Sequence, residues 1–175
     1  MAECDRAVFR LGLRGLAIDP GMLTPPMHLS DRRIYPVYRR CQELEVPVVL
    51  MSGGSAGPDV GYGSPVWIDQ VAADFPRLKI VAAHACWPWV TEILGVAYRR
   101  PNLYVSPDMY LVNMPGAQDY VQAANYYLED RFLFASAYPA LPLKGAVEAY
   151  KALPFTERAM EKALFHNAAH LLGLA

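Results

Sequence analysis

The sequence predicts an α/β fold built on a parallel sheet, and two observations support this. Short apolar runs rich in β-branched residues alternate with amphipathic segments five times. Parallel strands joined by helical crossovers are the simplest arrangement for such an alternation. The runs are also apolar at consecutive positions, which is typical of strands that are buried on both faces. The 175 residues show no linker and no shift in composition, so we expect one domain over residues 1–175.

Breakers and polar residues set the boundaries of each expected element. Strands are expected over 14–19, 46–51, 78–83, 103–106 and 131–137. Helices are expected over 5–11, 36–45, 65–75, 88–100, 118–128 and 143–153, and from Thr156 onward, with Thr156 as an N-cap.

The stretch 52–63 is rich in Gly, Ser and Pro. Its Gly-Gly-Ser could cradle a phosphate, but it lacks the Walker lysine and the dinucleotide glycine spacing, which favours a plain flexible loop.

Composition excludes several classes of partner. The chain is 54% hydrophobic and 19% charged with a net charge of −1, so nothing predicts binding to nucleic acid or to an anionic membrane. No apolar run approaches the roughly eighteen residues of a spanning helix, and the amino terminus lacks the pattern of a signal peptide. Three cysteines without paired spacing predict reduced thiols and a cytoplasmic protein.

Titratable residues follow three of the expected strands. His84 comes directly after 78–83, Asp108 comes shortly after 103–106, and Asp19 ends 14–19. The carboxyl ends of parallel strands are where α/β proteins place their chemistry, so these residues are candidates for one acid–base set. Histidine titrates near neutrality and suits a general acid or base. The alternatives are a structural histidine bonded to nearby backbone, and carboxylates that are solvated or cap a turn.

Several segments together resemble a known family. They are residues 13–20, 35–38 with 45–50, 75–89, 100–106, 130–139 and 167–174. In these segments the chain resembles the amidohydrolase-related family, in the branch of metal-dependent hydrolases and aminocarboxymuconate-semialdehyde decarboxylase-like enzymes. The resemblance runs in order over nearly the whole chain.

The resemblance implies a (β/α) barrel of TIM type that is incomplete in this chain. The family fold has eight strand–helix units and typically needs about 250 residues. The five units here resemble strands four to eight, and strands one to three have no counterpart. Because uncovered edges of buried-type strands invite association, we expect a homo-oligomer or a partner chain that covers the open sheet edges.

The resemblance also implies a divalent metal, with zinc as the candidate if the missing strands are supplied. The family pattern is a His-x-His pair on strand one, a His after strand five and an Asp after strand eight, with a further His after strand six. His84 matches the strand-six position. Met51 and Ala137 stand at the strand-five and strand-eight positions, and neither is a suitable ligand for such an ion. His84 is thus the one family-matching candidate, and the sequence predicts a degraded metal site.

The candidate site therefore has two catalytic residues, His84 and Asp108. The residues expected to contact a substrate are Asp19, Met51, Ser52, Trp87, Ser136 and Tyr138. Ser136 lacks the glycines of a nucleophile elbow and an evident base, so serine hydrolysis is not expected. Cys86 could be a soft ligand or a nucleophile, but a buried unreactive thiol is favoured. His166 and His170 have i, i+4 spacing without the other parts of a zinc motif, which favours a helix surface.

Two functions follow from this reading. The first is an enzyme resembling metal-dependent hydrolases or decarboxylases of small organic acids or cyclic amides, with a site rebuilt around His84. The second is a non-catalytic fragment of a barrel that serves as a binding or assembly subunit. The residues at positions 51 and 137 favour the second for the chain in isolation, whereas the resemblance favours the first.

Overall fold

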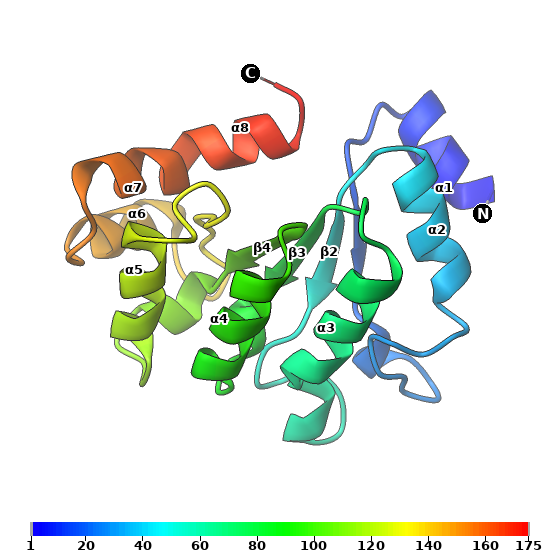
Figure 1. Cartoon of the computed structure of the whole chain (residues 1–175), viewed down its shortest axis with the longest axis horizontal. Helices are drawn as coiled ribbons and strands as arrows, with labels where there is room; N and C mark the ends of the chain where they lie inside the picture. Colours follow the sequence, from blue (N-terminus) through cyan, green and yellow to red (C-terminus); the bar gives the residue numbers. More distant parts are fainter. Residues whose placement is uncertain (1, 175) are drawn as a thin grey trace.

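A parallel four-stranded sheet forms the centre of the computed structural model, which describes residues 2–174 (Figure 1). Its strands lie side by side in chain order, as β1 (Leu16–Ile18), β2 (Val48–Met51), β3 (Ile80–Ala83) and β4 (Leu103–Ser106). All three pairings are parallel, so the prediction of a parallel α/β sheet is confirmed. Every carboxyl end of the four strands therefore lies at the same edge of the sheet.

Helices and short helical turns connect the strands. The α-helices are α1 (Ala2–Asp5), α2 (Tyr35–Glu43), α3 (Pro65–Asp74), α4 (Val90–Arg99), α5 (Ala117–Asn125), α6 (Leu143–Lys151), α7 (Glu157–Glu161) and α8 (Asn167–Leu171). The turns are η1 (Arg6–Arg10), η2 (Pro20–Met22), η3 (Val60–Gly63), η4 (His84–Cys86), η5 (Asp108–Leu111) and η6 (Lys162–His166), of which η1 and η6 are π-helical. The Thr156 hydroxyl accepts the Ala159 amide at 3.2 Å, as an N-cap should. No helix among residues 2–174 is both long and apolar enough to cross a bilayer.

The two faces of the sheet are covered differently. Side chains that alternate along the strands, including Val48, Leu50, Ile80 and Leu103, are fully buried in the main core with residues of the connecting helices. The other face carries a row in which Val49, Val81 and Tyr104 are in register. A second, small cluster covers this row, and Leu133 and Leu171 belong to it. The helix α8 thus contributes Leu171 to the cover of this face.

The segment 131–137, predicted to be a strand, forms only one bridge to the sheet, so the prediction is wrong for the rest of the segment. Val105 donates to the Arg131 carbonyl and accepts from Leu133, both at 2.9 Å, which gives one parallel bridge to Phe132. The Phe134 amide, which points away from β4 in this register, donates to the Ala163 carbonyl at 2.9 Å, in the π-helical turn η6. No further backbone hydrogen bond to β4 follows Leu133 among the described residues, so no ladder forms. The sheet therefore has four strands and one bridge rather than five strands.

Candidate functional site

The two predicted catalytic residues meet at the carboxyl edge of the sheet. His84 follows β3 and Asp108 follows the neighbouring strand β4. The Asp108 carboxylate oxygen Oδ2 lies 2.7 Å from His84 Nδ1 and accepts the His84 backbone amide at 3.0 Å. The other oxygen, Oδ1, accepts the Met109 amide at 2.6 Å. The approach at Nδ1 is close but falls outside the angular range of a hydrogen bond, so this contact is electrostatic.

The backbone at this edge is left-handed at four residues that are not glycine. The φ angle is 63° at His84, 44° at Ala85, 57° at Cys86 and 45° at Asp108. Each such residue costs on the order of 1–3 kcal/mol and persists only where its surroundings fix it. Ser52, at the end of β2, supplies one fixed point, because its hydroxyl donates to the Ala83 carbonyl at 2.8 Å and accepts the Cys86 amide at 3.3 Å. The strain is thus concentrated around His84.

Aromatic rings and a glycine enclose the imidazole of His84. Tyr110 presents its ring edge-on, with 5.7 Å between ring centroids, and Trp87 stacks flat on Tyr110 at 5.0 Å. On another side, a Cβ atom added to Gly53 would lie 2.5 Å from the His84 Cβ and 3.0 Å from Tyr110 Cε2. Position 53 therefore has to be glycine for the loop after β2 to approach this closely. The Gly-Gly sequence serves close packing in this structure.

A cavity of about 250 Å³ opens beside His84. Its lining residues come from the ends of β1, β2 and β3 and from the loop after β2, and they are Asp19, Met22, Met51, Gly53, Ser55, Ala56 and His84. The Asp19 oxygen Oδ1 is buried and has no hydrogen-bond partner. Buried polar atoms are nearly always paired in folded proteins, so this oxygen is an exception in the wall of the cavity. This cavity brings three of the predicted site residues together.

The other predicted site residues lie elsewhere. Ser52 is fully buried and its hydroxyl already has two backbone partners. Trp87 donates its indole N–H to the Pro115 carbonyl at 3.1 Å and faces a different, smaller hollow. Ser136 and Tyr138 lie outside the His84 cavity, in the segment that leaves the sheet after Phe132, and Tyr138 is 78% exposed. For these four, contact with a substrate stays a prediction.

The structure favours a buried unreactive thiol for Cys86 and a helix surface for His166 and His170. Cys86 is fully buried, and this burial raises the pKa of its thiol to about 12, so the thiol is neutral and shielded. All three cysteines are free. His166 and His170 are both exposed on the carboxyl-terminal helices.

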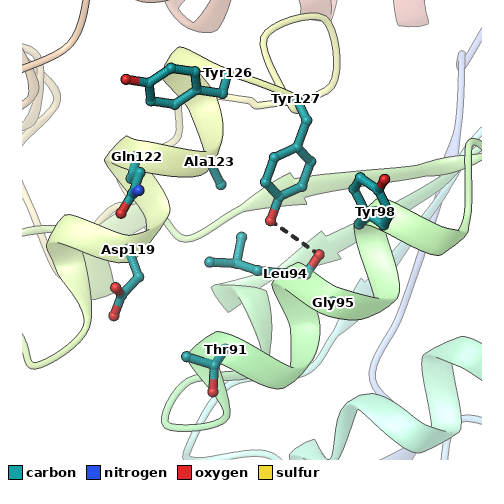
Figure 2. A pocket seen from close by; sticks show the side chains of 9 residues that line it. All are labelled: Thr91, Leu94, Gly95, Tyr98, Asp119, Gln122, Ala123, Tyr126 and Tyr127. Carbon is teal, nitrogen blue, oxygen red and sulfur yellow. Dashed lines mark hydrogen bonds between the residues drawn. The ribbon is translucent and has the colours of Figure 1, made fainter.

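A hollow larger than the cavity beside His84 lies away from this chemistry. It is a groove of about 690 Å³ between α4 and α5, and Figure 2 shows Tyr98, Tyr126 and Tyr127 along it. The Tyr127 hydroxyl donates to the Leu94 carbonyl at 3.3 Å. Asp119 is the one titratable group other than tyrosine among the lining residues, so the groove has no acid–base pair. We therefore place the candidate active site at His84 and not in this groove.

Parallel strand–helix units with titratable residues at the carboxyl ends of the strands define a partial (β/α) barrel of TIM type. The chain matches the amidohydrolase family over residues 1–174 and belongs to that family. It is 50% identical to an uncharacterised TIM-barrel protein from Bordetella bronchiseptica, with a TM-score of 0.94 over 99% of this chain and 62% of that chain.

Two enzymes with named activities are more distant. A dihydroxybenzoic acid decarboxylase from Polaromonas sp., solved with bound manganese and an inhibitor, has the same fold with a TM-score of 0.76 at 19% identity, over 99% of this chain and 64% of that one. A 2-keto-4-carboxy-3-hexenedioate hydratase from Sphingobium sp. is 33% identical over 101 residues, which are 48% of this chain and 29% of the hydratase. The chain thus spans less than two thirds of the length of each of these three relatives.

The side chains of this chain do not fit the divalent metal that the family implies. No group of three or more His, Cys, Asp or Glu side chains is placed to hold a metal among residues 2–174. The cavity beside His84 offers one imidazole, one carboxylate and the thioether of Met51, and a thioether is a poor ligand for hard or borderline ions. Ala137 has no donor atom. We therefore derive no chemical step through a metal.

Sequence reasoning missed the residues that surround the pair. Tyr110 and Gly53 pack on the His84 imidazole, and two buried tyrosines, Tyr120 and Tyr150, donate to the backbone of this edge. Tyr110 could have been suspected from the sequence, because it lies only two residues beyond Asp108. The contact from Tyr150 could not be predicted in this way, because it joins residues 42 positions apart.

Proposed function

We propose that this chain carries the proton-transfer part of an active site that decarboxylates or hydrates a small conjugated carboxylic acid. The observation that carries the proposal is the 2.7 Å approach between His84 Nδ1 and the buried carboxylate of Asp108. The negative charge of a carboxylate this close to one ring nitrogen favours the proton there, even without a well-aligned hydrogen bond, and leaves Nε2 to exchange a proton with a substrate. The names of the relatives, a decarboxylase and a hydratase, support this choice over hydrolysis.

Both reactions need a group that gives a proton to a carbon atom, and hydration also needs a proton to be removed from water. In decarboxylation, the bond to the carboxylate breaks, CO₂ leaves, and the carbon that keeps the electron pair takes a proton. In hydration, a water oxygen bonds to one carbon of a double bond, a proton is lost from that water, and the neighbouring carbon gains a proton. His84 beside Asp108 is the group of this chain that we expect to hold and release such a proton.

The cavity beside His84 sets the expected recognition. Its lining includes no lysine or arginine, so His84 in its protonated form would meet the charge of an acid. The unpaired oxygen of Asp19 would accept a hydrogen bond from a hydroxyl group of the substrate. Met51 would contribute an apolar wall. We therefore expect an acid that also carries a hydroxyl group.

The test is a turnover assay with 2,6-dihydroxybenzoate and with an unsaturated keto acid, following CO₂ release and ultraviolet absorbance. We expect turnover of one class, reduced about 10²–10⁴-fold by His84→Asn. His166→Asn is the matched control, because this histidine is exposed. Absence of turnover for both classes, or a His84→Asn variant as active as His166→Asn, would contradict the proposal.

A second candidate, a non-catalytic binding or assembly subunit, is favoured by two observations. Met51 and Ala137 occupy the positions where the family places ligands. In addition, β1 pairs with one neighbour among the described residues, and Ala17 at its centre is exposed. Such a subunit would be a homo-oligomer or would bind a partner chain along β1.

Sedimentation velocity of the purified chain together with metal analysis distinguishes the enzyme from the non-catalytic subunit. An inactive, metal-free oligomer supports the subunit, and an active chain excludes it. A cytoplasmic location stays a prediction.

A further inference from the structure

Two buried tyrosine hydroxyls donate hydrogen bonds to backbone carbonyls in the segments with positive φ. Tyr150, in α6, donates to the Asp108 carbonyl at 3.1 Å, and Tyr120, in α5, donates to the Ala85 carbonyl at 2.9 Å. Both side chains are fully buried. They reach the site from two different helices, and each contacts the carbonyl of a residue with positive φ. Neither hydroxyl lies in the cavity beside His84.

These carbonyls belong to the same backbone segments as His84 and Asp108. A residue with positive φ turns its peptide groups to directions that an ordinary conformation does not reach. If Asp108 relaxed to a negative φ, its carboxylate would leave the His84 amide and imidazole. Burial raises the pKa of both phenols, and the charge of Asp108 raises both further, so the hydroxyls remain protonated donors. Neither Ala85 nor Asp108 is a glycine, the residue that adopts a positive φ without steric cost.

We propose that Tyr150 and Tyr120 are positioning residues whose hydroxyls hold Asp108 and Ala85 in the left-handed conformation and thereby keep the Asp108 carboxylate against the His84 imidazole. This rests on the proposed function insofar as His84 and Asp108 are the reacting pair. The geometric part of the claim can be measured without any substrate.

The experiment compares Tyr150→Phe and Tyr120→Phe with Tyr38→Phe in the full chain. Tyr38 is also fully buried and donates to a carbonyl, that of Leu29, at 2.7 Å, so its variant loses the same kind of bond away from the site. The readout is the ¹⁵N chemical shifts of the His84 imidazole, which report its tautomer. The sequence has four histidines, and His84→Asn identifies the signals of this one.

We expect Tyr150→Phe and Tyr120→Phe to move the His84 nitrogen shifts away from the Nδ1–H tautomer, and Tyr38→Phe to leave them in place. If turnover is found, kcat should fall by up to about 10²-fold with KM little changed in the first two variants. Unchanged His84 shifts in both would overturn the proposal even if His84→Asn abolishes turnover. Moved shifts in a chain without turnover would support the positioning role and reject the proposed function.

Phenylalanine keeps the ring in the core, so near-ultraviolet circular dichroism should show all three variants folded. If one of the two site variants unfolds, the other decides. If neither folds while Tyr38→Phe does, the hydroxyls are required for folding rather than for placing the pair, and the proposal is wrong.

Discussion

The carboxyl ends of β3 and β4 differ sharply from those of β1 and β2. At β3 and β4, the Asp108 carboxylate has contacts on both oxygens and lies beside a strained backbone. At β1 and β2, the Asp19 carboxylate has a buried oxygen without a partner, and a cavity opens next to it. Two aspartates at the same edge of one sheet thus have opposite surroundings.

This difference separates the two tasks of a binding site. A group that has to keep one geometry needs partners within the protein, as Asp108 has. A group that has to meet a ligand keeps a bonding position free, as Asp19 does. The β3 and β4 side is therefore the fixed half of the candidate site, and the β1 and β2 side is the receptive half.

Asp108→Ala should give the largest effect on stability. It leaves the amides of His84 and Met109 without acceptors in a buried place and puts alanine at a positive φ. We expect the free energy of unfolding to fall by about 2–5 kcal/mol, measured by urea denaturation. Asp108→Asn keeps one acceptor oxygen and tolerates this φ, so it should lose much less. Equal losses in both variants would mean that the carboxylate does not fix this edge.

Gly53→Ala should come next. The added Cβ would collide with His84 and Tyr110, which costs about 1–3 kcal/mol of unfolding free energy. The control is Gly95→Ala in α4, where a Cβ would meet nothing within 4 Å, so stability should rise by about 0.5–1 kcal/mol. A Gly53→Ala variant as stable as the parent would show that the loop does not hold the imidazole.

Asp19→Asn should change stability by less than about 1 kcal/mol, because the buried oxygen it alters has no partner to lose. Calorimetric titration with 2,6-dihydroxybenzoate should nevertheless show weaker binding for this variant than for the parent. A stability loss as large as that of Asp108→Ala would remove the contrast between the two aspartates.

The smallest effect concerns Cys86. Because its thiol pKa is raised to about 12, the thiolate is scarce at pH 8, and burial blocks access as well. We expect no labelling of Cys86 by iodoacetamide in the folded chain over an hour, followed by peptide mass spectrometry. Labelling of all three cysteines in urea is the control. Rapid labelling of Cys86 in the native chain would show that this edge opens readily.

Sequence reasoning reached the fold where the signal is local. The strand 103–106 was predicted with its observed bounds, since its apolar run is followed directly by Pro107. The segment 131–137 has an equally apolar run, but it makes a single bridge to β4 at Phe132, and the Phe134 amide on its other side bonds to Ala163, 29 residues away in sequence. A local pattern cannot show how far a segment stays beside its neighbouring strand.

The same limit applies to the candidate site. His84 and Asp108 could be placed from their positions after neighbouring strands. Their left-handed backbone could not, because the usual signal for positive φ is glycine, and this sequence has His-Ala-Cys at the turn. Ser52 was read as a substrate contact, whereas its hydroxyl bonds to the backbone of the neighbouring strand end.

Leu171 packs with Val81, Tyr104 and Leu133 on the face of the sheet opposite the main core, and none of these four side chains lines the cavity beside His84. Shortening Leu171 would therefore loosen the contact between the carboxyl-terminal helix and the sheet while leaving the wall of the cavity as it is. The attachment of the last helix and the shape of the candidate site can thus vary independently of each other.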